Sequence, residues 1–102
     1  MKYTIYWTDN WKCKNWGEGK DTFTTDTYEF DNDKDALLIG VSIQEEEDAE
    51  NVFEELDDVS EEELKRILSE VDVSSGAPVV FWIKRGPKKI YDTGMTRRDW
   101  NS

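Results

Sequence analysis

The sequence predicts a small α+β domain, an antiparallel sheet of about four strands with two or three helices packed on one face. Residues 3–30 and 79–92 contain short segments rich in β-branched and aromatic residues, separated by turn residues, which indicates strands. Residues 49–71 instead repeat apolar residues at helical spacing. In a chain of 102 residues this order favours a single domain over 1–102, with an acidic helical segment, 45–72, inserted between an N-terminal and a C-terminal β-hairpin.

The first hairpin is predicted from residues 3–7 and 22–30. In the first strand, Tyr3, Ile5 and Trp7 would share one face, because side chains alternate along a strand. The second strand is polar but rich in threonine. Residues 9–20 contain Asn and Gly residues that break regular structure, so we expect a long loop between the two strands.

A helix is expected next, over residues 36–43. This short apolar run fits either a buried strand or a buried helix, and periodicity alone does not decide between them. Four of its residues would share one helical face, and these are Ala36, Ile39, Gly40 and Ile43. We therefore favour a helix that Asp33 caps.

Two further helices follow from apolar stripes at i, i+3, i+4 and i+7. The first stripe consists of Ala49, Val52, Phe53 and Leu56, and the second of Leu64, Ile67, Leu68 and Val71. Ser60 and Glu63 form a capping box at the start of the second helix. Glu61 and Glu62 precede Lys65 and Arg66 by four residues, which predicts two stabilising ion pairs on its surface.

The C-terminal hairpin is predicted from residues 79–84 and 88–92, joined by a turn at Gly86-Pro87. Residues 74–78 are small or helix-breaking and end the preceding helix. Both faces of the strand over 79–84 are apolar, so we expect a central strand that is covered on both sides. Residues 96–99 would form a last capped turn of helix.

The residue types that serve most enzymes and metal sites are missing. The chain has no histidine, one cysteine, no CxxC pair and no glycine-rich phosphate loop. Asp31, Asp33 and Asp35 match the first three ligand positions of an EF-hand, but Ala36 and Ser42 stand where that loop needs Gly and Glu. We therefore expect a protein that is not an enzyme and has no metal site and no cofactor.

The setting expected for the protein is the cytoplasm. Cys13 is the single cysteine, so no internal disulfide can form, and no signal peptide is apparent. The longest apolar stretches, 36–41 and 77–83, are too short to cross a bilayer, and we expect no membrane interaction.

The net charge of −11 is concentrated in the middle of the chain. Residues 45–72 hold fourteen acids and two bases, and residues 45–58 hold nine acids and no base. A single helix over 45–58 would place like charges at i and i+4 and would put Asp57 and Asp58 at the negative end of its dipole. A sequence that keeps these unfavourable contacts suggests a surface selected for binding.

The predicted partner-binding residues are these nine acids together with two tryptophans of the 9–20 loop. They are Glu45, Glu46, Glu47, Asp48, Glu50, Glu54, Glu55, Asp57, Asp58, Trp11 and Trp16. For the tryptophans, an aromatic interface patch competes with simple packing in a small domain. The basic residues of the second hairpin, 84–89, would be solvated or would neutralise acidic helices, and no direct binding of nucleic acid is expected.

Such a surface favours a small acidic inhibitor that mimics DNA or RNA in the basic groove of a nucleic-acid-binding protein, such as a nuclease or a CRISPR effector. Small, acidic, cysteine-poor proteins of this kind are typical of phage counter-defence, including anti-CRISPR and anti-restriction proteins. Two alternatives stay open. One is an immunity protein or antitoxin that neutralises a basic nuclease, and the other is a generic protein-interaction module whose acidity confers solubility.

Overall fold

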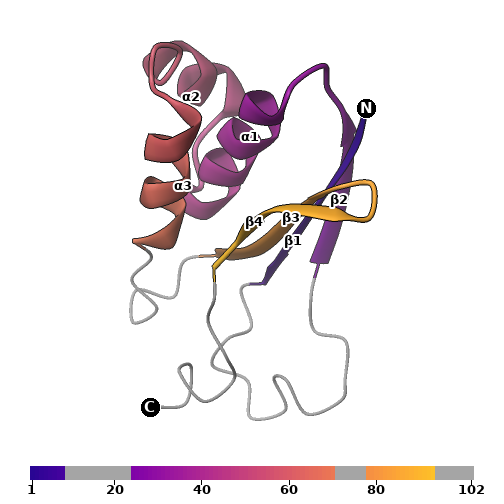
Figure 1. The fold of residues 1–102 in the computed structure, drawn as a ribbon. Coiled ribbons are helices and arrows are strands. Elements are labelled where there is room, and N and C mark those ends of the chain that lie inside the picture. Colours follow the sequence, from indigo (N-terminus) through magenta and orange to yellow (C-terminus); the bar gives the residue numbers. More distant parts are fainter. Residues whose placement is uncertain (9–23, 71–77, 94–102) are drawn as a thin grey trace, which may run out of the picture.

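The computed structural model describes residues 1–8, 24–70 and 78–93. Four strands form one sheet in the order β2-β1-β3-β4, and three helices lie between β2 and β3 in the chain. All three helices lie on the same side of the sheet (Figure 1). The predicted α+β fold, with its antiparallel sheet of four strands, is confirmed. The expected loop over 9–20, the helix end at 74–77 and the last turn at 96–99 lie outside the described residues.

The sheet joins the two predicted hairpins through their first strands. β1 (Lys2–Thr8) pairs antiparallel with β2 (Thr24–Glu29) and, on its other side, with β3 (Val79–Arg85). β3 pairs antiparallel with β4 (Lys88–Asp92), and Gly86 between them takes the positive φ of 58° that glycine tolerates. Tyr3 and Ile5 are fully buried and Trp7 packs against the core, which confirms that these three residues share a face.

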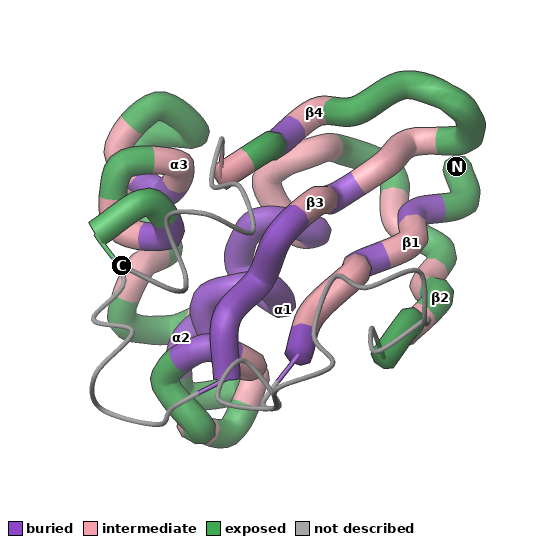
Figure 2. Tube along the Cα trace, turned by 90° about the horizontal axis from the view of Figure 1, so that it is seen from below, coloured by how far each residue is buried: buried purple, intermediate pink, exposed green. Residues whose placement is uncertain are grey.

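The expected central position of β3 is also confirmed. Val79, Val80, Phe81 and Ile83 are all buried, while Trp82 is half-buried. In Figure 2 the buried residues concentrate along β3 and along the helix behind it, α1 (Asp33–Glu45). The core is therefore one cluster between the middle of the sheet and α1, onto which the other two helices pack.

Helix α1 confirms that the apolar run at 36–43 is helical. It lies directly on β3 and is covered on its other side by α3 (Glu61–Ser69), which explains its nearly continuous burial from Ala36 to Ser42. Gly40 faces both neighbours. A Cβ at this position would lie 3.1 Å from Ile83 Cδ1, which is tight, and 3.5 Å from Leu68 Cδ2, which is an ordinary van der Waals contact. The absence of a side chain therefore relieves the contact with β3.

The cap of α1 differs from the prediction. Asn32, not Asp33, accepts the capping hydrogen bond, from the backbone N–H of Asp35 at 3.0 Å. Asp33 points instead to the sheet, where it accepts hydrogen bonds from the hydroxyl of Tyr3 at 2.6 Å and from the guanidinium of Arg85 at 2.8 and 2.9 Å. The aspartates that resemble the start of an EF-hand thus begin a helix and tie it to β1 and β3.

The predicted single helix over 45–58 is wrong. Helix α1 continues to Glu45, Glu46 adopts a left-handed conformation with φ of 53°, and α2 (Ala49–Glu55) begins after a short link. Only the pair Glu50 and Glu54 keeps the unfavourable i,i+4 spacing inside α2. The break lets Val52 of α2 turn back onto the core, where it is 1% exposed.

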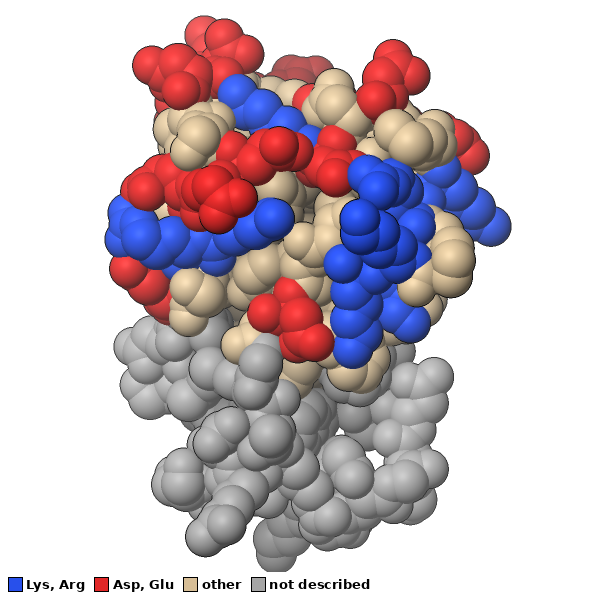
Figure 3. Space-filling view, viewed as in Figure 1, with Lys and Arg blue, Asp and Glu red and all other residues tan. Residues whose placement is uncertain are grey.

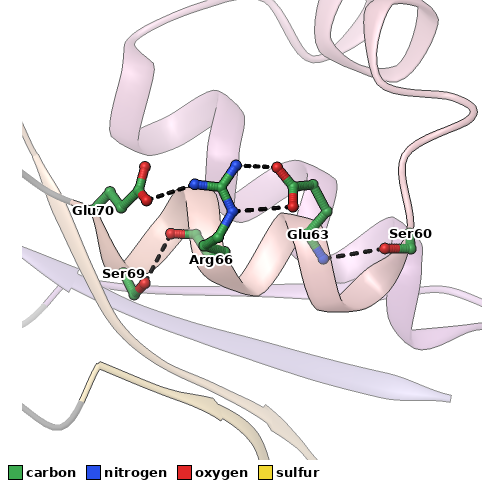
Figure 4. A network of polar contacts seen from close by, with 5 residues as sticks. All are labelled: Ser60, Glu63, Arg66, Ser69 and Glu70. Carbon is green, nitrogen blue, oxygen red and sulfur yellow. Dashed lines mark hydrogen bonds and ion pairs between the residues drawn. The ribbon is translucent and has the colours of Figure 1, made fainter.

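Helix α3 begins as predicted, with the Ser60 hydroxyl accepting from the N–H of Glu63 at 3.2 Å. The side chain of Glu63, however, binds Arg66 rather than closing the box, and Arg66 also donates to Glu70 at 2.6 Å (Figure 4). The predicted partner of Arg66, Glu62, is therefore replaced by two other glutamates. This exposed network occupies the outer face of α3, and its ion pairs stabilise the helix only modestly.

One buried glutamine connects the helices to the sheet. Gln44 donates through Nε2 to the carbonyl of Leu68 at 3.1 Å, at the end of α3. Its Oε1 accepts from the N–H of Val80 at 3.2 Å, next to the register shift of β1 at Tyr6/Trp7. Both polar ends of the amide are thereby satisfied in the core, which a buried side chain requires. Gln44 thus fixes where α1 ends.

Tyr91 provides a direct test of the packing. Its hydroxyl is buried and has no hydrogen-bond partner among the described residues, and burial raises the pKa of Tyr91 to about 12. We expect Tyr91→Phe to raise the free energy of unfolding by about 1 kcal/mol, because it removes an unsatisfied buried group. Thermal melts at pH 7 measure this. The wild type should lose further stability above about pH 10, where the unfolded tyrosine ionises first, and an unchanged or lower melting temperature would contradict the prediction.

Candidate partner-binding surface

The nine acids of residues 45–58, which we call the nine-acid segment, lie along the end of α1, the link, α2 and the turn that follows α2. Eight of them are exposed, and Glu47 is half-exposed. The opposite side of α2 faces the core through the buried Val52 and the half-buried Ala49, Phe53 and Leu56. The apolar stripe predicted from the sequence is thus turned inward, and its acids are turned outward.

The carboxylates of this segment have no cationic partner among the residues that the structure describes. The ion pairs found there join Glu29, Asp33, Glu63, Glu70 and Asp92 to bases, and none includes an acid of residues 45–58. Lys34 donates to the backbone carbonyl of Asp57 and not to a carboxylate. The segment therefore presents uncompensated negative charge to solvent.

The basic residues lie mostly elsewhere. Figure 3 shows acidic side chains over the helices with some basic side chains between them, and a further group of basic side chains over the β3–β4 hairpin. On that hairpin, Arg85 pairs with Asp33 and Lys89 pairs with Asp92, while Lys84 lies 5.1 Å from the ring centroid of Tyr6. The ion pair of Arg85 reaches the start of α1 and not the acidic helices that this cluster was expected to neutralise, since no ion pair joins the hairpin to residues 45–70 in the described part of the chain.

A groove between α1 and α2 opens directly beside these acids. It has a volume of about 620 Å³ and is lined by Ile39, Ala49, Glu50, Phe53, Glu54 and Asp57. We call it the α1–α2 groove. Its floor is apolar and its rim carries three carboxylates of the nine-acid segment. The sequence prediction missed this groove, because its floor combines one residue of α1 with two of α2.

A second groove adjoins the first. It has a volume of about 380 Å³ and shares Phe53 and Asp57 with the α1–α2 groove. Its other lining residues come from the start of α1 and the start of α3, and they are Asn32, Lys34, Asp35, Leu38 and Glu61. Phe53 and Asp57 thus line both grooves, and the second groove carries Lys34 beside its acids.

The two tryptophans predicted as binding residues, Trp11 and Trp16, lie outside the described residues. Trp7, the tryptophan of β1, has a structural role. Its Nε1 donates to Asp26 of β2 at 2.8 Å, which links the two strands of the first hairpin. For this tryptophan, packing within the domain is the interpretation that the structure supports.

No feature of a metal site or of a membrane helix is found in the described part of the chain. Within residues 1–8, 24–70 and 78–93, no three acidic or cysteine side chains are grouped to hold a metal ion. No helix in the same residues is long and apolar enough to cross a membrane. Comparisons with family models, with curated proteins and with solved structures return no match.

Proposed function

We propose that the protein is a non-enzymatic inhibitor that covers the basic nucleic-acid-binding groove of a partner protein. The observation that supports this proposal is the nine-acid segment, in which eight of the nine acids are exposed and none has a cationic partner among the described residues. Lysines and arginines that normally contact phosphates would contact these carboxylates instead. The protein itself would not bind nucleic acid, because its negative charge repels phosphates.

The electrostatics favour binding of such a partner in two ways. Outside the interface, a net charge of −11 attracts a basic surface over long range and speeds association. Within the interface, carboxylates and guanidinium groups form charge-assisted hydrogen bonds, which are stronger than neutral ones. The acids have no cationic partners among the described residues. Binding therefore replaces water at the carboxylates with the partner's cations and breaks no existing ion pair of the nine-acid segment.

Phage counter-defence in the cytoplasm, against a nuclease or a CRISPR effector, is the setting that we propose. A single cysteine suits a reducing compartment. An immunity protein acting on a toxic nuclease would use the same electrostatics. The identity of the captured partner distinguishes these two settings.

The first experiment is a pull-down from the native host, washed at about 0.05 M and at about 0.5 M salt, which shortens the Debye length severalfold. We expect a basic nucleic-acid-binding protein that is retained at low salt and depleted at high salt. The recovered partner is then tested for competition between this protein and DNA or RNA. A stable ternary complex of the three would contradict mimicry, as would direct binding of nucleic acid to this protein.

A further inference from the structure

The α1–α2 groove combines two properties that charge alone does not explain. A surface that only mimics phosphates needs exposed carboxylates and no apolar floor. Here the half-buried ring of Phe53 and the side chains of Ile39 and Ala49 line the bottom, directly below the acids. The groove volume of about 620 Å³ falls within the range of binding pockets, about 300–1,000 Å³.

The rim determines which apolar group the floor can accept. Glu50, Glu54 and Asp57 surround the opening, and none of them forms an ion pair within the described residues. An acidic or phosphorylated group would be repelled, and a neutral apolar group would leave the three carboxylates without partners. An apolar side chain with a cation on either side satisfies both the floor and the rim.

The adjoining hollow extends this surface along α1. The two grooves share Phe53 and Asp57, and the second adds the apolar Leu38, the acids Asp35 and Glu61, and the polar Asn32 and Lys34. An apolar residue with carboxylates beside it therefore occurs in both grooves, although Lys34 takes part of the edge of the second. A polypeptide segment with an apolar residue beside basic ones matches two adjoining grooves of this kind better than a single small cation.

We infer that the α1–α2 groove is the docking site for a polypeptide segment of the partner protein, in which an apolar side chain flanked by lysine or arginine inserts against Phe53. This inference rests on the proposed function, since it assumes a basic protein partner. It adds an apolar anchor to the electrostatic surface. The anchor gives the complex a component that salt screens little, because apolar burial does not depend on ionic strength as ion pairs do.

Two synthetic peptides test the groove before the partner is identified. One is Lys-Arg-Lys-Leu-Lys-Arg-Lys, and the other has serine in place of the central leucine. Both are titrated into the isotopically labelled full chain at about 0.15 M salt and followed by NMR. We expect the leucine peptide to bind about tenfold more tightly, because burying a leucine side chain is worth at least this factor. Its titration should shift the signals of Ile39, Ala49 and Phe53.

A pair of variants with unchanged net charge provides the control. Ala49→Leu fills the floor of the groove, whereas Asn51→Leu adds the same side chain to an exposed position of α2 that does not line it. We expect the leucine peptide to lose its tenfold advantage in Ala49→Leu and to keep it in Asn51→Leu. Circular dichroism of both variants verifies that α2 and the fold are intact.

The possible results separate the groove from the proposed function. If both peptides bind equally and both are released by salt, the groove inference is wrong while the electrostatic proposal stands. If the advantage of leucine persists in Ala49→Leu, the apolar contact lies elsewhere and the inference is also wrong. If neither peptide binds even at about 0.05 M salt, the groove inference fails, and the pull-down alone decides the proposed function.

Discussion

Reversing two charges of the nine-acid segment is expected to weaken the complex with a basic nucleic-acid-binding partner about a hundredfold. The variant is Glu55→Lys with Asp58→Lys, two exposed residues that do not line the α1–α2 groove. Each change removes an attraction and introduces a repulsion, and a loss of about 1.4 kcal/mol for each would give this factor. Most of the loss at low salt should appear in the association rate, which biolayer interferometry with the captured partner measures.

A matched variant elsewhere on the molecule controls for net charge. Glu29→Lys with Asp31→Lys changes the net charge by the same amount but lies at the end of β2 and just after it. We expect it to lower the affinity much less, because neither residue belongs to the nine-acid segment or lines either groove, and the attraction between exposed charges is screened over about 10 Å at 0.1 M salt. Equal losses in the two variants would indicate a general charge effect and would contradict a binding surface at the nine-acid segment.

The same reversal should leave the fold intact. Glu55 and Asp58 are exposed and form no ion pair among the described residues, so their replacement removes no stabilising contact there. Surface changes of this kind usually alter the free energy of unfolding by less than about 0.5 kcal/mol. A loss of affinity at unchanged melting temperature therefore reports on binding alone.

Local patterns in the sequence identify the elements of this fold but not every boundary. The stripe of Leu64 and Leu68 and the Ser60 cap predict α3 correctly, since each depends on residues within one or two turns. The end of α1 has no such signal. Glu46 takes a left-handed conformation that non-glycine residues rarely adopt, and no glycine marks the turn. Tertiary contacts account for it, because Gln44 is held between α3 and β3 while Val52 returns to the core.

Part of the candidate surface could also be predicted from the sequence, because it depends on local patterns. Charge counting alone locates the nine-acid segment, and an apolar stripe alone turns those acids outward. The groove beside them needs Ile39 of α1 to meet Phe53 of α2, and the relative placement of two helices is not encoded in either stripe. The contact of Asp33 with Arg85 likewise spans 52 residues, which no local pattern reports.

Loss of the contact between Asp33 and Arg85 is expected to cause the largest change in stability. Asp33 accepts hydrogen bonds from Tyr3, whose side chain is fully buried, and through both of its carboxylate oxygens from the Arg85 guanidinium. Asp33→Asn keeps the size of the side chain but removes its negative charge. It also places the N–H donors of the new amide against the donor groups of Tyr3 and Arg85. We expect the free energy of unfolding to fall by about 2 kcal/mol at pH 7, since hydrogen bonds to charged groups are worth about 1.5–3 kcal/mol. This corresponds to a melting temperature lower by about 10 °C for a domain of this size.

The pH dependence distinguishes this contact from a general effect of helix charge. Burial opposes ionisation of Asp33, but the hydrogen bonds from Tyr3 and Arg85 and the charge of Arg85 outweigh it and lower the pKa of Asp33. A carboxylate with a lowered pKa stabilises the fold above its unfolded pKa, near 3.9, and loses this contribution as pH falls through its folded pKa. The difference in unfolding free energy between wild type and Asp33→Asn should therefore be full at pH 6 and should shrink below about pH 4.

Asp35→Asn is the matched control, because Asp35 lies in the same first turn of α1 and its replacement removes the same charge near the helix N-terminus. Both variants lose the favourable interaction with the helix dipole, which is worth about 0.3–1 kcal/mol, but only Asp33→Asn loses the contacts to the sheet. Urea denaturation of the three proteins between pH 3 and pH 7 measures the difference. If Asp33→Asn and Asp35→Asn unfold at the same urea concentration throughout this range, the contact of Asp33 with Tyr3 and Arg85 contributes nothing beyond the helix dipole.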